Sequence, residues 1–258
     1  MNDAEFENIQ ALEEGMWWFR GQRKILNGLL DPLALLGPLP LLDLRGGHVR
    51  VLEAGCGTAY QSRELARRYG WQMTPLDLSA AGLRHGRKLG VGDLVQGDLQ
   101  GLPFKNEAFD AVLSLDVIVH FPPGEEALAF EELARVLRPG GLFVVRVSAL
   151  NLLRSRHSIF THEKQRFTAS HLRQCSAAVG VDALRVTYAN SLLVPVALFK
   201  FRVWEPLTNA PPASGVAAIP GWLDTIFGGL LALEAKLIGA GVNLPLGQSL
   251  LLVGRKRS

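Results

Sequence analysis

Apolar runs alternate with amphipathic stretches from residue 49 to residue 188 of the chain. Buried strands are predicted for the short apolar runs at residues 49–53, 71–76, 91–95, 109–115, 142–147 and 181–188. Helices are predicted for the stretches with apolar residues at helical spacing, at residues 61–69, 80–89, 124–137 and 168–179. Strands and helices in alternation imply a parallel sheet with right-handed crossovers and helices on both faces.

Local signals indicate where several of these helices begin and end. Ser79 is suited to cap the second helix, because a serine oxygen can accept a hydrogen bond from a free N–H of the first turn. Gly70 and Gly90 predict the ends of the first two helices, and Pro139-Gly140-Gly141 predicts the end of the third.

The alternation loosens after the sixth predicted strand. A last apolar run at residues 249–253 predicts a strand that returns to the sheet. Residues 190–248 then form an apolar, proline-rich insertion of about 60 residues, where a few are usual. We therefore divide the chain into an N-terminal helical lid (1–45), an α/β core (46–189), this helical insertion, and a final strand with a basic tail (249–258).

The composition is that of a globular protein, and the N-terminal residues lead us to expect one that stays inside the cell. The 258 residues suffice for one large α/β domain with a cap, and 48% hydrophobic with 20% charged residues excludes a disordered or fibrous chain. Lys and Arg exceed Asp and Glu only by 27 to 24, too little to predict nucleic-acid binding. Asp3, Glu5 and Glu7 replace the basic region of a secretory signal, so we expect a cytoplasmic protein.

The two cysteines and the most apolar stretch both have ordinary explanations. Cys56 and Cys175 lack CxxC spacing and enough partners for a metal site, so we expect free thiols and no metal.

The apolar stretch at residues 226–242 contains Glu234 and Lys236 and is shorter than the roughly 20 apolar residues of a membrane span. It predicts an amphipathic or buried helix.

A glycine turn joins the first predicted strand to its helix. The segment Glu53-Ala54-Gly55-Cys56-Gly57-Thr58 allows a tight turn and a close approach of the backbone to a ligand, beside the free N–H groups of a helix start. The dinucleotide fingerprint requires a third small residue at position 60, where this chain has Tyr60. The turn therefore favours a polar ligand other than a pyrophosphate.

Three acidic residues follow the next three predicted strands. Asp77 stands 20 residues after Gly57, where an acid can accept hydrogen bonds from both ribose hydroxyls. Asp98 could accept the exocyclic amine of an adenine, with the backbone N–H of Leu99 beside it, and Asp116 closes the fourth strand. Because ligands bind at the carboxyl edge of such a sheet, the acids together predict a nucleoside site. Taken singly, Asp77 could instead cap a turn, and each acid could be a solvated loop charge.

Residues 49–147 contain four motifs in this order: VLEAGCGT, TPLDLS, QGDLQGLPFKNEAFDAVLSLDVIVHF and ELARVLRPGGLFVV. With these motifs the segment resembles the class I methyltransferases that depend on S-adenosylmethionine (SAM). The similarity is to the small-molecule subgroup of ubiquinone and menaquinone biosynthesis. The resemblance implies a Rossmann-like, doubly wound sheet of seven strands, with the seventh antiparallel and inserted beside the fifth. Pro75, inside the second predicted strand, departs from the usual pattern and leaves the end of that strand open.

The resemblance also implies a set of cofactor contacts. Gly55 and Gly57 would contact the methionine part of SAM, Asp77 the ribose, and Asp98 with Leu99 the adenine. The neighbouring residues of the same motifs complete the expected cofactor-binding set: Glu53, Cys56, Leu78 and Asp116.

The methyl group of SAM is already activated, so the protein needs chiefly to align the acceptor for in-line displacement and to exclude water. An oxygen or nitrogen acceptor that bears a proton also needs a base, and His120, just past the fourth strand, is the best placed candidate. A histidine that caps or packs a helix before Phe121-Pro122 explains the residue equally well.

Three consecutive aromatic residues mark the first helix candidate, in Glu14-Gly15-Met16-Trp17-Trp18-Phe19-Arg20. Neighbours on a helix point about 100° apart, so all three cannot face one core. We predict a lid over SAM, with Trp18 or Arg20 near the cofactor. Simple packing of an N-terminal helix is the alternative.

The insertion at residues 190–248 emerges beside the expected site and is strongly apolar. It predicts either a pocket wall for a hydrophobic acceptor or a homodimer interface, with contact to a membrane surface as a less favoured third reading. A basic stretch at residues 151–167 lies at the same edge. It is suited to a polar or anionic part of the acceptor, although a solvated charge run explains it more simply.

Three functions fit these observations to different degrees. The first is transfer of a methyl group from SAM to a small, partly hydrophobic acceptor. The second is a non-catalytic SAM-binding or assembly module whose insertion recruits a partner. A nicotinamide oxidoreductase comes third, since the chain has Tyr60 in the glycine turn and no Tyr-x-x-x-Lys pair.

Overall fold

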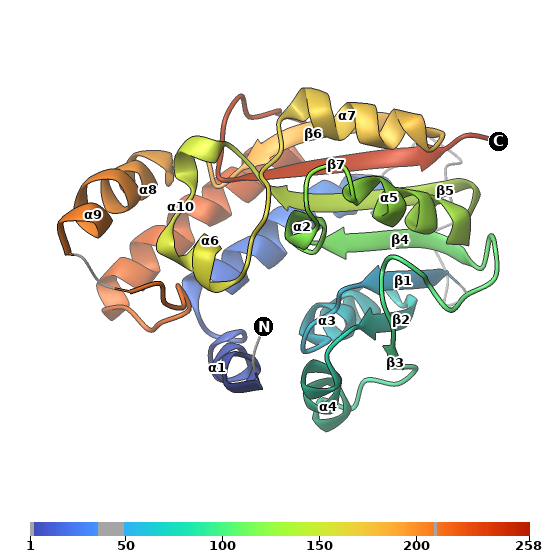
Figure 1. Ribbon diagram of the computed structural model, residues 1–258, viewed down its shortest axis with the longest axis horizontal. Helices are drawn as coiled ribbons and strands as arrows, with labels where there is room; N and C mark the ends of the chain where they lie inside the picture. Colours follow the sequence, from blue (N-terminus) through green and yellow to red (C-terminus); the bar gives the residue numbers. More distant parts are fainter. Residues whose placement is uncertain (1–2, 36–48, 209–210) are drawn as a thin grey trace.

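The protein folds around one seven-stranded sheet (Figure 1), described here from a computed structural model for residues 3–35, 49–208 and 211–258. The strand order is β3-β2-β1-β4-β5-β7-β6, and β7 alone runs antiparallel to its neighbours, β5 and β6. The strands are β1 Arg50–Ala54, β2 Gln72–Asp77, β3 Val95–Gln96, β4 Phe109–Leu115, β5 Leu137–Ser148, β6 Val181–Ala189 and β7 Ser249–Lys256. The predicted fold class, with an antiparallel last strand inserted beside the fifth, is confirmed.

Helices cover both faces of the sheet and its carboxyl edge. The α-helices are α1 Asp3–Leu12, α2 Trp17–Leu35, α3 Tyr60–Tyr69, α4 Ala80–Lys88, α5 Glu126–Val136, α6 Arg156–Phe160, α7 Ala169–Ala178, α8 Val194–Phe199, α9 Glu205–Thr208 and α10 Gly221–Gly239. Short 3₁₀ turns η1 (Ile118–His120) and η2 (Asn151–Leu153) and a π-helical turn η3 (Lys200–Trp204) complete the set. In Figure 1 the carboxyl ends of the parallel strands point to the left, where α1, α6, α8 and α9 lie.

Most predicted elements are confirmed to within a few residues, one predicted strand needs correction, and the open end of another is now defined. The strand expected at residues 91–95 is reduced to Val95–Gln96, because Val91 and Leu94 pack instead against Leu83 beside the glycine turn. Pro75 does not end β2, which continues to Asp77. A proline has no N–H to donate, and β3 pairs with β2 only from Leu76 onward.

The Pro139-Gly140-Gly141 segment lies within β5 rather than in a separate loop. Helix α5 ends at Val136, and β5 begins at once with Leu137, opposite Phe109. The pairing with β4 then skips to Ala111 opposite Leu142, so the extra residues form a bulge.

The two faces of the sheet have different covers. Helices α5 and α7 supply Phe130, Leu133 and Leu172 to the core on one face. On the other face, α2 and α10 supply Leu26 and Leu231 to a second core that includes residues of β1, β4, β5 and β7. The second half of the predicted insertion therefore belongs to the body of the domain. The boundary proposed between residues 45 and 46 lies outside the described residues.

Helices α2 and α10 pack closely along a seam of small residues. A Cβ atom added to Gly28 would lie 2.6 Å from the carbonyl oxygen of Ala235, and one added to Gly21 would lie 2.1 Å from Cδ1 of Leu231. These distances are shorter than van der Waals contact, so a side chain at either glycine would push the helices apart. The N-terminal segment and the insertion, far apart in sequence, are thereby joined.

No helix among the described residues is long and apolar enough to cross a membrane. Helix α10, which contains most of the apolar stretch at residues 226–242, buries Glu234 and packs against the sheet. The prediction of a buried or amphipathic helix is confirmed there.

Both cysteines are free thiols, as expected. Cys175 nevertheless has two neighbours with metal-ligand atoms, Glu126 and His171, all within 4.8 Å of one another. The Glu126 carboxylate is already engaged, since it accepts hydrogen bonds from the backbone of Gly124 and the side chain of Gln165 and contacts Nε2 of His171 at 3.1 Å. These bonds account for the cluster without an ion.

The seam predicts opposite effects for one substitution at two helical glycines. Gly28→Ala should lower the free energy of unfolding by about 1–3 kcal/mol, because the new methyl group meets the backbone of α10. Gly229→Ala, in α10 with open space around its Cβ position, should raise it by about 0.5–1 kcal/mol through helix propensity. Urea unfolding of both variants measures the difference, and equal effects would contradict the close packing.

Candidate active site

One large cavity of about 1620 Å³ opens at the carboxyl edge of the sheet. Its walls come from α1 and α2, the ends of the first five strands, α6 and the first half of the insertion. All the residues predicted for the site except Arg20 line it: Trp18, Glu53, Gly55, Cys56, Gly57, Asp77, Leu78, Asp98, Leu99, Asp116 and His120. Residues chosen from four separate sequence motifs thus meet around one space.

The glycine turn forms the floor of this cavity. Gly55 has φ +84° and Gly57 has φ +57°, and the backbone N–H groups of Gly55 and Cys56 both donate to the carbonyl of Leu76, at 2.7 and 2.9 Å. A Cβ atom on Gly55 would lie 2.1 Å from Cγ2 of Val117. Both the positive φ and this close approach require glycine at position 55.

Asp77 holds the turn and the start of α4 together. One carboxylate oxygen accepts the N–H of Gly57 at 2.7 Å, and the other accepts the N–H of Ser79 at 2.8 Å. Burial raises the pKa of Asp77, and these two hydrogen bonds act in the opposite direction. The carboxylate is fixed in orientation and keeps further lone pairs for hydroxyl groups in the cavity.

The next strand end supplies Asp98 and Leu99. Asp98 is exposed and accepts the N–H of Gln100 at 2.9 Å, while the side chain of Leu99 is buried beneath it. Leu78, on the neighbouring loop, leaves 68% of its surface exposed in the cavity wall. An apolar side chain exposed beside an acid is suited to a flat ring with a polar edge, such as an adenine.

Two buried carboxyl groups lie beneath and beside the turn. Burial raises the pKa of Glu53 to about 7, partly offset by the hydrogen bond that Ser62 donates to it. Burial likewise raises the pKa of Glu13 to about 7, although Thr58 donates to its Oε2 at 2.5 Å. Oε1 of Glu13 is buried without a hydrogen-bond partner, which leaves it free to accept from a donor in the cavity.

Glu13 was not predicted, because it lies in the turn between α1 and α2, far from the four motifs. The helix expected at residues 14–20 in fact begins at Trp17. The only feature of the sequence that pointed to Glu13 was the aromatic run beside it.

Asp116 begins a chain of polar contacts that runs across the end of the sheet. Its carboxylate receives Nε and Nη2 of Arg146 at 2.9 and 2.6 Å, and Nη1 of Arg146 donates to the side chain of Gln22 at 3.1 Å. Gln22 in turn donates to Oδ1 of Asn190 at 2.7 Å. Strands β4 and β5, helix α2 and the start of the insertion are linked in this way.

This series of polar contacts ends at Glu234, a fully buried acid of α10. Its carboxylate accepts the backbone N–H groups of Asn190, Ser191 and Leu192, the last two at 2.8 and 3.2 Å. Burial raises the pKa of Glu234, and these three bonds act in the opposite direction. The carboxylate thus fixes the point where the insertion leaves the sheet.

His120 lies at the end of η1 on the cavity wall. Its Nδ1 is 3.5 Å from the carbonyl oxygen of His162, a long contact that leaves the ring free to reorient. Loss of solvation lowers the pKa of His120, against the opposing effects of His162 and Asp116. The neutral imidazole at pH 7 can accept a proton.

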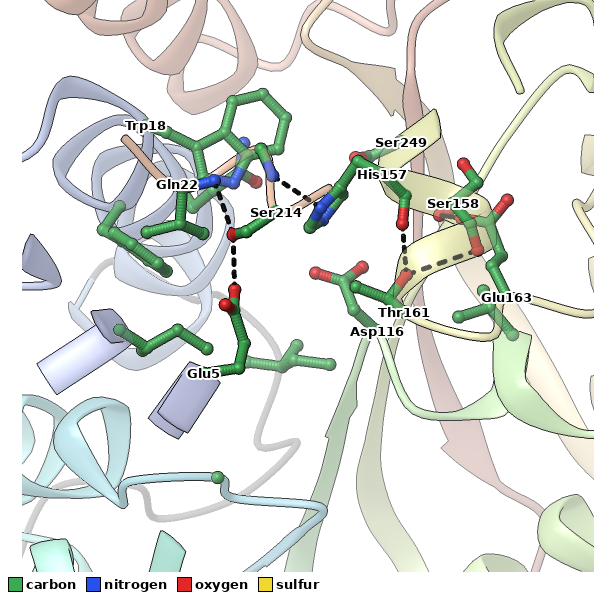
Figure 2. A pocket seen from close by; sticks show the side chains of 18 of the residues that line it. Glu5, Trp18, Gln22, Asp116, His157, Ser158, Thr161, Glu163, Ser214 and Ser249 are labelled. Atoms are coloured by element: carbon green, nitrogen blue, oxygen red, sulfur yellow. Dashed lines mark hydrogen bonds between the residues drawn. The ribbon is translucent and has the colours of Figure 1, made fainter. Parts of the chain in front are cut away.

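The aromatic residues of α2, Trp17, Trp18 and Phe19, all line the cavity, whereas the arginine that follows them does not. Trp17 packs edge-on against Trp18 and Phe227, with ring centroids 5.6 and 5.1 Å apart. Arg20, which was expected near the cofactor, instead pairs with Asp224 of α10 at 2.6 Å and lies outside the cavity lining. Trp18 lines the cavity, and Figure 2 shows it beside Gln22.

A set of single hydrogen bonds closes the cavity on the side of the insertion. Ser214 donates to Glu5 of α1 at 2.6 Å, and the N–H of Gly215 donates to Nδ1 of His157 in α6 at 2.8 Å (Figure 2). Asn8 of α1 also donates to the carbonyl of Val216, at 3.0 Å. The loop that holds Ser214, Gly215 and Val216 thus bridges α1 and α6.

The basic stretch at residues 151–167 is mostly used inside the protein. Arg166 forms a buried ion pair with Glu163 at 2.6 Å, and Arg156 binds Glu205 of α9 through its backbone and its side chain. Arg154 donates to the carbonyl of Glu163. The side chains of His162 and Lys164 are exposed in the cavity wall, and neither has a hydrogen-bond or ion-pair partner in the described part of the chain.

The part of the chain that contains the glycine turn and the acids at the strand ends is similar to known methyltransferases. Residues 52–145 match the model of the methyltransferase domain. A sterol 24-C-methyltransferase of Gibberella zeae is 36% identical over 105 residues, which cover 38% of this chain and 27% of that protein. A fatty-acid O-methyltransferase of Mycolicibacterium smegmatis is 41% identical over 99 residues, or 37% of this chain and 35% of that protein. The matched segment therefore spans less than half of either relative.

The fold is similar to that of solved methyltransferase structures. Phosphoethanolamine N-methyltransferase 2 of Haemonchus contortus, in complex with S-adenosyl-L-methionine, superimposes with a TM-score of 0.61 at 17% identity. The match covers 100% of this chain and 58% of that chain.

The buried acids predict that stability without ligand falls as the pH rises. The pKa of Glu13 is about 7 in the folded chain against 4.5 for an ordinary glutamate, so between these values the folded state holds the extra proton. Glu13→Gln should remove the part of this dependence that Glu13 contributes. Its stability relative to wild type should rise between pH 4.5 and pH 8 by on the order of 3 kcal/mol, measured by urea unfolding at each pH.

Glu53 titrates in both proteins and cancels in that difference. Exposed Glu7 of α1 provides the control, since Glu7→Gln should leave the pH profile of wild type unchanged. Parallel profiles for wild type and Glu13→Gln would contradict the raised pKa.

Proposed function

Because residues 52–145 form a class I SAM-dependent methyltransferase domain, we propose that the whole chain transfers a methyl group from SAM to a small, partly hydrophobic acceptor. The observation that supports this most directly is the convergence of Gly55, Gly57, Asp77 and Asp98 on one cavity. A single nucleoside with a charged tail can contact all four residues only if they face one space, and all four line the same cavity.

The residues present suit this cofactor. Asp77 would accept the ribose hydroxyls, since its carboxylate is already oriented by two backbone N–H groups. Leu78 and Asp98 would cover the face and the edge of the adenine, with Leu99 beneath them. The turn at Gly55 to Gly57 would lie under the methionine part.

Charge supports the same placement. SAM carries a sulfonium and an ammonium group, and the cavity wall contains the acids Glu13, Glu53, Asp77 and Asp116. The unpartnered Oε1 of Glu13 is suited to the ammonium group, because a buried acceptor without a donor is unfavourable until one is supplied. A cationic ligand would also favour the charged form of Glu13 and Glu53.

The rest of the cavity has two kinds of wall, which together suit an amphipathic acceptor. On the polar side, Ser148 donates to Glu163 at 2.8 Å and is paired with Ser249 across β5 and β7. Apolar side chains of the insertion form the other side: Leu193, Val196, Ala197, Phe201 and Trp204. The relatives named above act on a sterol and a fatty acid, molecules that combine a polar group with a large apolar body.

The cofactor supplies an activated methyl group, and the chain supplies position, a dry environment and a base. The acceptor would lie with its polar group toward His120 and its apolar body along the insertion, so that the reacting atoms meet in line. The loop with Ser214 and Gly215 closes the cavity toward α1 and α6 and limits the access of water. Where the acceptor bears a proton, His120 would remove it.

Calorimetry and a transfer assay test the proposal together. Wild type should bind SAM and not NAD, and a metabolite extract incubated with trideuterated SAM should contain a newly labelled product in mass spectrometry. Asp77→Asn should weaken SAM binding by roughly 100-fold, through the loss of charge-assisted bonds to the ribose. Asp93→Asn, the same change in an exposed loop outside the cavity, is the control.

Binding of NAD without SAM would refute the proposal. Unchanged SAM affinity in Asp77→Asn would remove the assignment of that residue. Tight SAM binding without any labelled product would support the binding-module function instead.

A base at position 120 makes a kinetic prediction. With an oxygen or nitrogen acceptor, His120→Gln should lower kcat by roughly 10²-fold or more and leave the Kd for SAM unchanged. Because the pKa of His120 is lowered, the wild-type rate should stay level with falling pH until below the usual histidine range and then decrease. An unchanged kcat and pH profile in His120→Gln would show that the residue only packs the wall.

A further inference from the structure

A helical segment of the insertion turns an apolar stripe toward water. Residues 194–208 are helical throughout, as α8, η3 and α9. Val196, Phe199, Val203 and Leu207 recur along it at intervals of three or four residues and are 46%, 60%, 45% and 77% exposed. We call these four residues the outer stripe.

The adjacent side of the same segment is apolar as well. Val196, the first residue of the outer stripe, also lines the cavity, as do Ala197, Phe201 and Trp204. Val194 and Ala197 pack on Leu153 of η2. A helix on a protein surface normally presents polar residues to water, so an apolar outer face needs a partner. Single exposed apolar residues are common, whereas exposed apolar residues that recur along one face of a helix indicate an interaction surface.

The charges of the insertion favour an anionic partner. Residues 190–248 contain three acids and three bases, so the sequence of the insertion is neutral. All three acids are engaged by other groups: the Glu205 carboxylate accepts the backbone N–H of Arg156, Asp224 forms an ion pair with Arg20, and Glu234 is fully buried.

The three bases of the insertion, by contrast, all face water. Lys200, which also lines the cavity, and Arg202 lie within the same helical segment as the outer stripe, and Lys236 lies on α10. The surface of the insertion, as far as the structure describes it, is therefore positive although its composition is not.

We propose that the outer stripe docks the protein on the surface of an anionic lipid bilayer. Phe199, Val203 and Leu207 would enter the boundary between head groups and acyl chains, and Lys200 and Arg202 would contact lipid phosphates. Leu152, 59% exposed, adjoins this surface, since its carbonyl accepts Nε of Arg202 at 2.7 Å. The contact is peripheral, by one face of a short helical segment.

Docking in this way would place the cavity next to a bilayer in which a hydrophobic acceptor is dissolved. The segment that carries the outer stripe is also the apolar wall of the cavity, so an acceptor dissolved in the bilayer could reach the site without crossing water. This part of the proposal rests on the proposed function, whereas the docking itself does not.

A second copy of the chain fits the stripe less well. A symmetric dimer through the outer stripe would bring Lys200 and Arg202 close to their counterparts, and each acid of the described insertion is already engaged or buried. Like charges at an interface oppose association, whereas an anionic bilayer neutralises them.

Vesicle flotation with the full chain tests the docking. Wild type should partition onto phosphatidylcholine vesicles that contain about one quarter phosphatidylglycerol, and only weakly onto pure phosphatidylcholine. The triple variant Phe199→Ser, Val203→Ser, Leu207→Ser should lose at least about tenfold in partition coefficient. Lys200→Gln and Arg202→Gln should each lose about fivefold on the anionic vesicles.

Matched controls exclude general effects of polarity and charge. Leu128→Ser with Leu184→Ser removes two apolar residues of similar exposure elsewhere, and Lys88→Gln with Lys105→Gln removes two exposed charges elsewhere. Neither control should change partition. Calorimetry with SAM on the triple variant separates the two proposals, since its residues lie outside the cavity lining and SAM affinity should persist.

The docking proposal is overturned if wild type ignores lipid charge or fails to bind vesicles. It is also overturned if the triple variant partitions like wild type. A concentration-dependent dimer of wild type in light scattering, absent in the triple variant, would assign the stripe to self-association instead.

Discussion

The candidate site depends on a buried chain of polar contacts that runs from Asp116 through Arg146, Gln22 and Asn190 to Glu234. Each member lies on a different element, so β4, β5, α2, the end of β6 and α10 are fixed relative to one another. Most of these groups are withdrawn from water, and a partner lost from such a network leaves another group unsatisfied at a large cost in free energy. The walls of the cavity therefore keep their places although they come from opposite ends of the chain.

The positions of the core elements followed from the sequence because their signals are local. Gly55 and Gly57 need positive φ, Ser79 caps a helix, and the run at residues 109–115 is apolar throughout, and each of these features acts within a few residues. The two-residue β3 was overestimated because Val91 and Leu94 are apolar for a different reason, packing against Leu83. Periodicity alone cannot separate these cases.

The parts of the site that the sequence did not reveal depend on contacts between distant segments. Glu13 is one acid among several near the N-terminus, and only its burial against Thr58 distinguishes it. Arg20 is a plausible ligand for a cofactor until Asp224, about 200 residues later, lies beside it. Helix α10 is apolar on nearly every side, which suits a pocket wall, an interface or a core equally. Its glycine seam with α2 decides for the core.

The cavity is held more firmly on its floor than on its outer side. The glycine turn is fixed by two N–H bonds to Leu76 and by Asp77, and the polar chain behind it involves five elements. The loop around Ser214 is attached to α1 and α6 by a few single hydrogen bonds between partly exposed groups. Segments with few buried contacts open at lower free energy than the core. An acceptor should therefore enter past this loop, beside the helical segment whose outer face is apolar, while the nucleoside end of the cavity stays rigid.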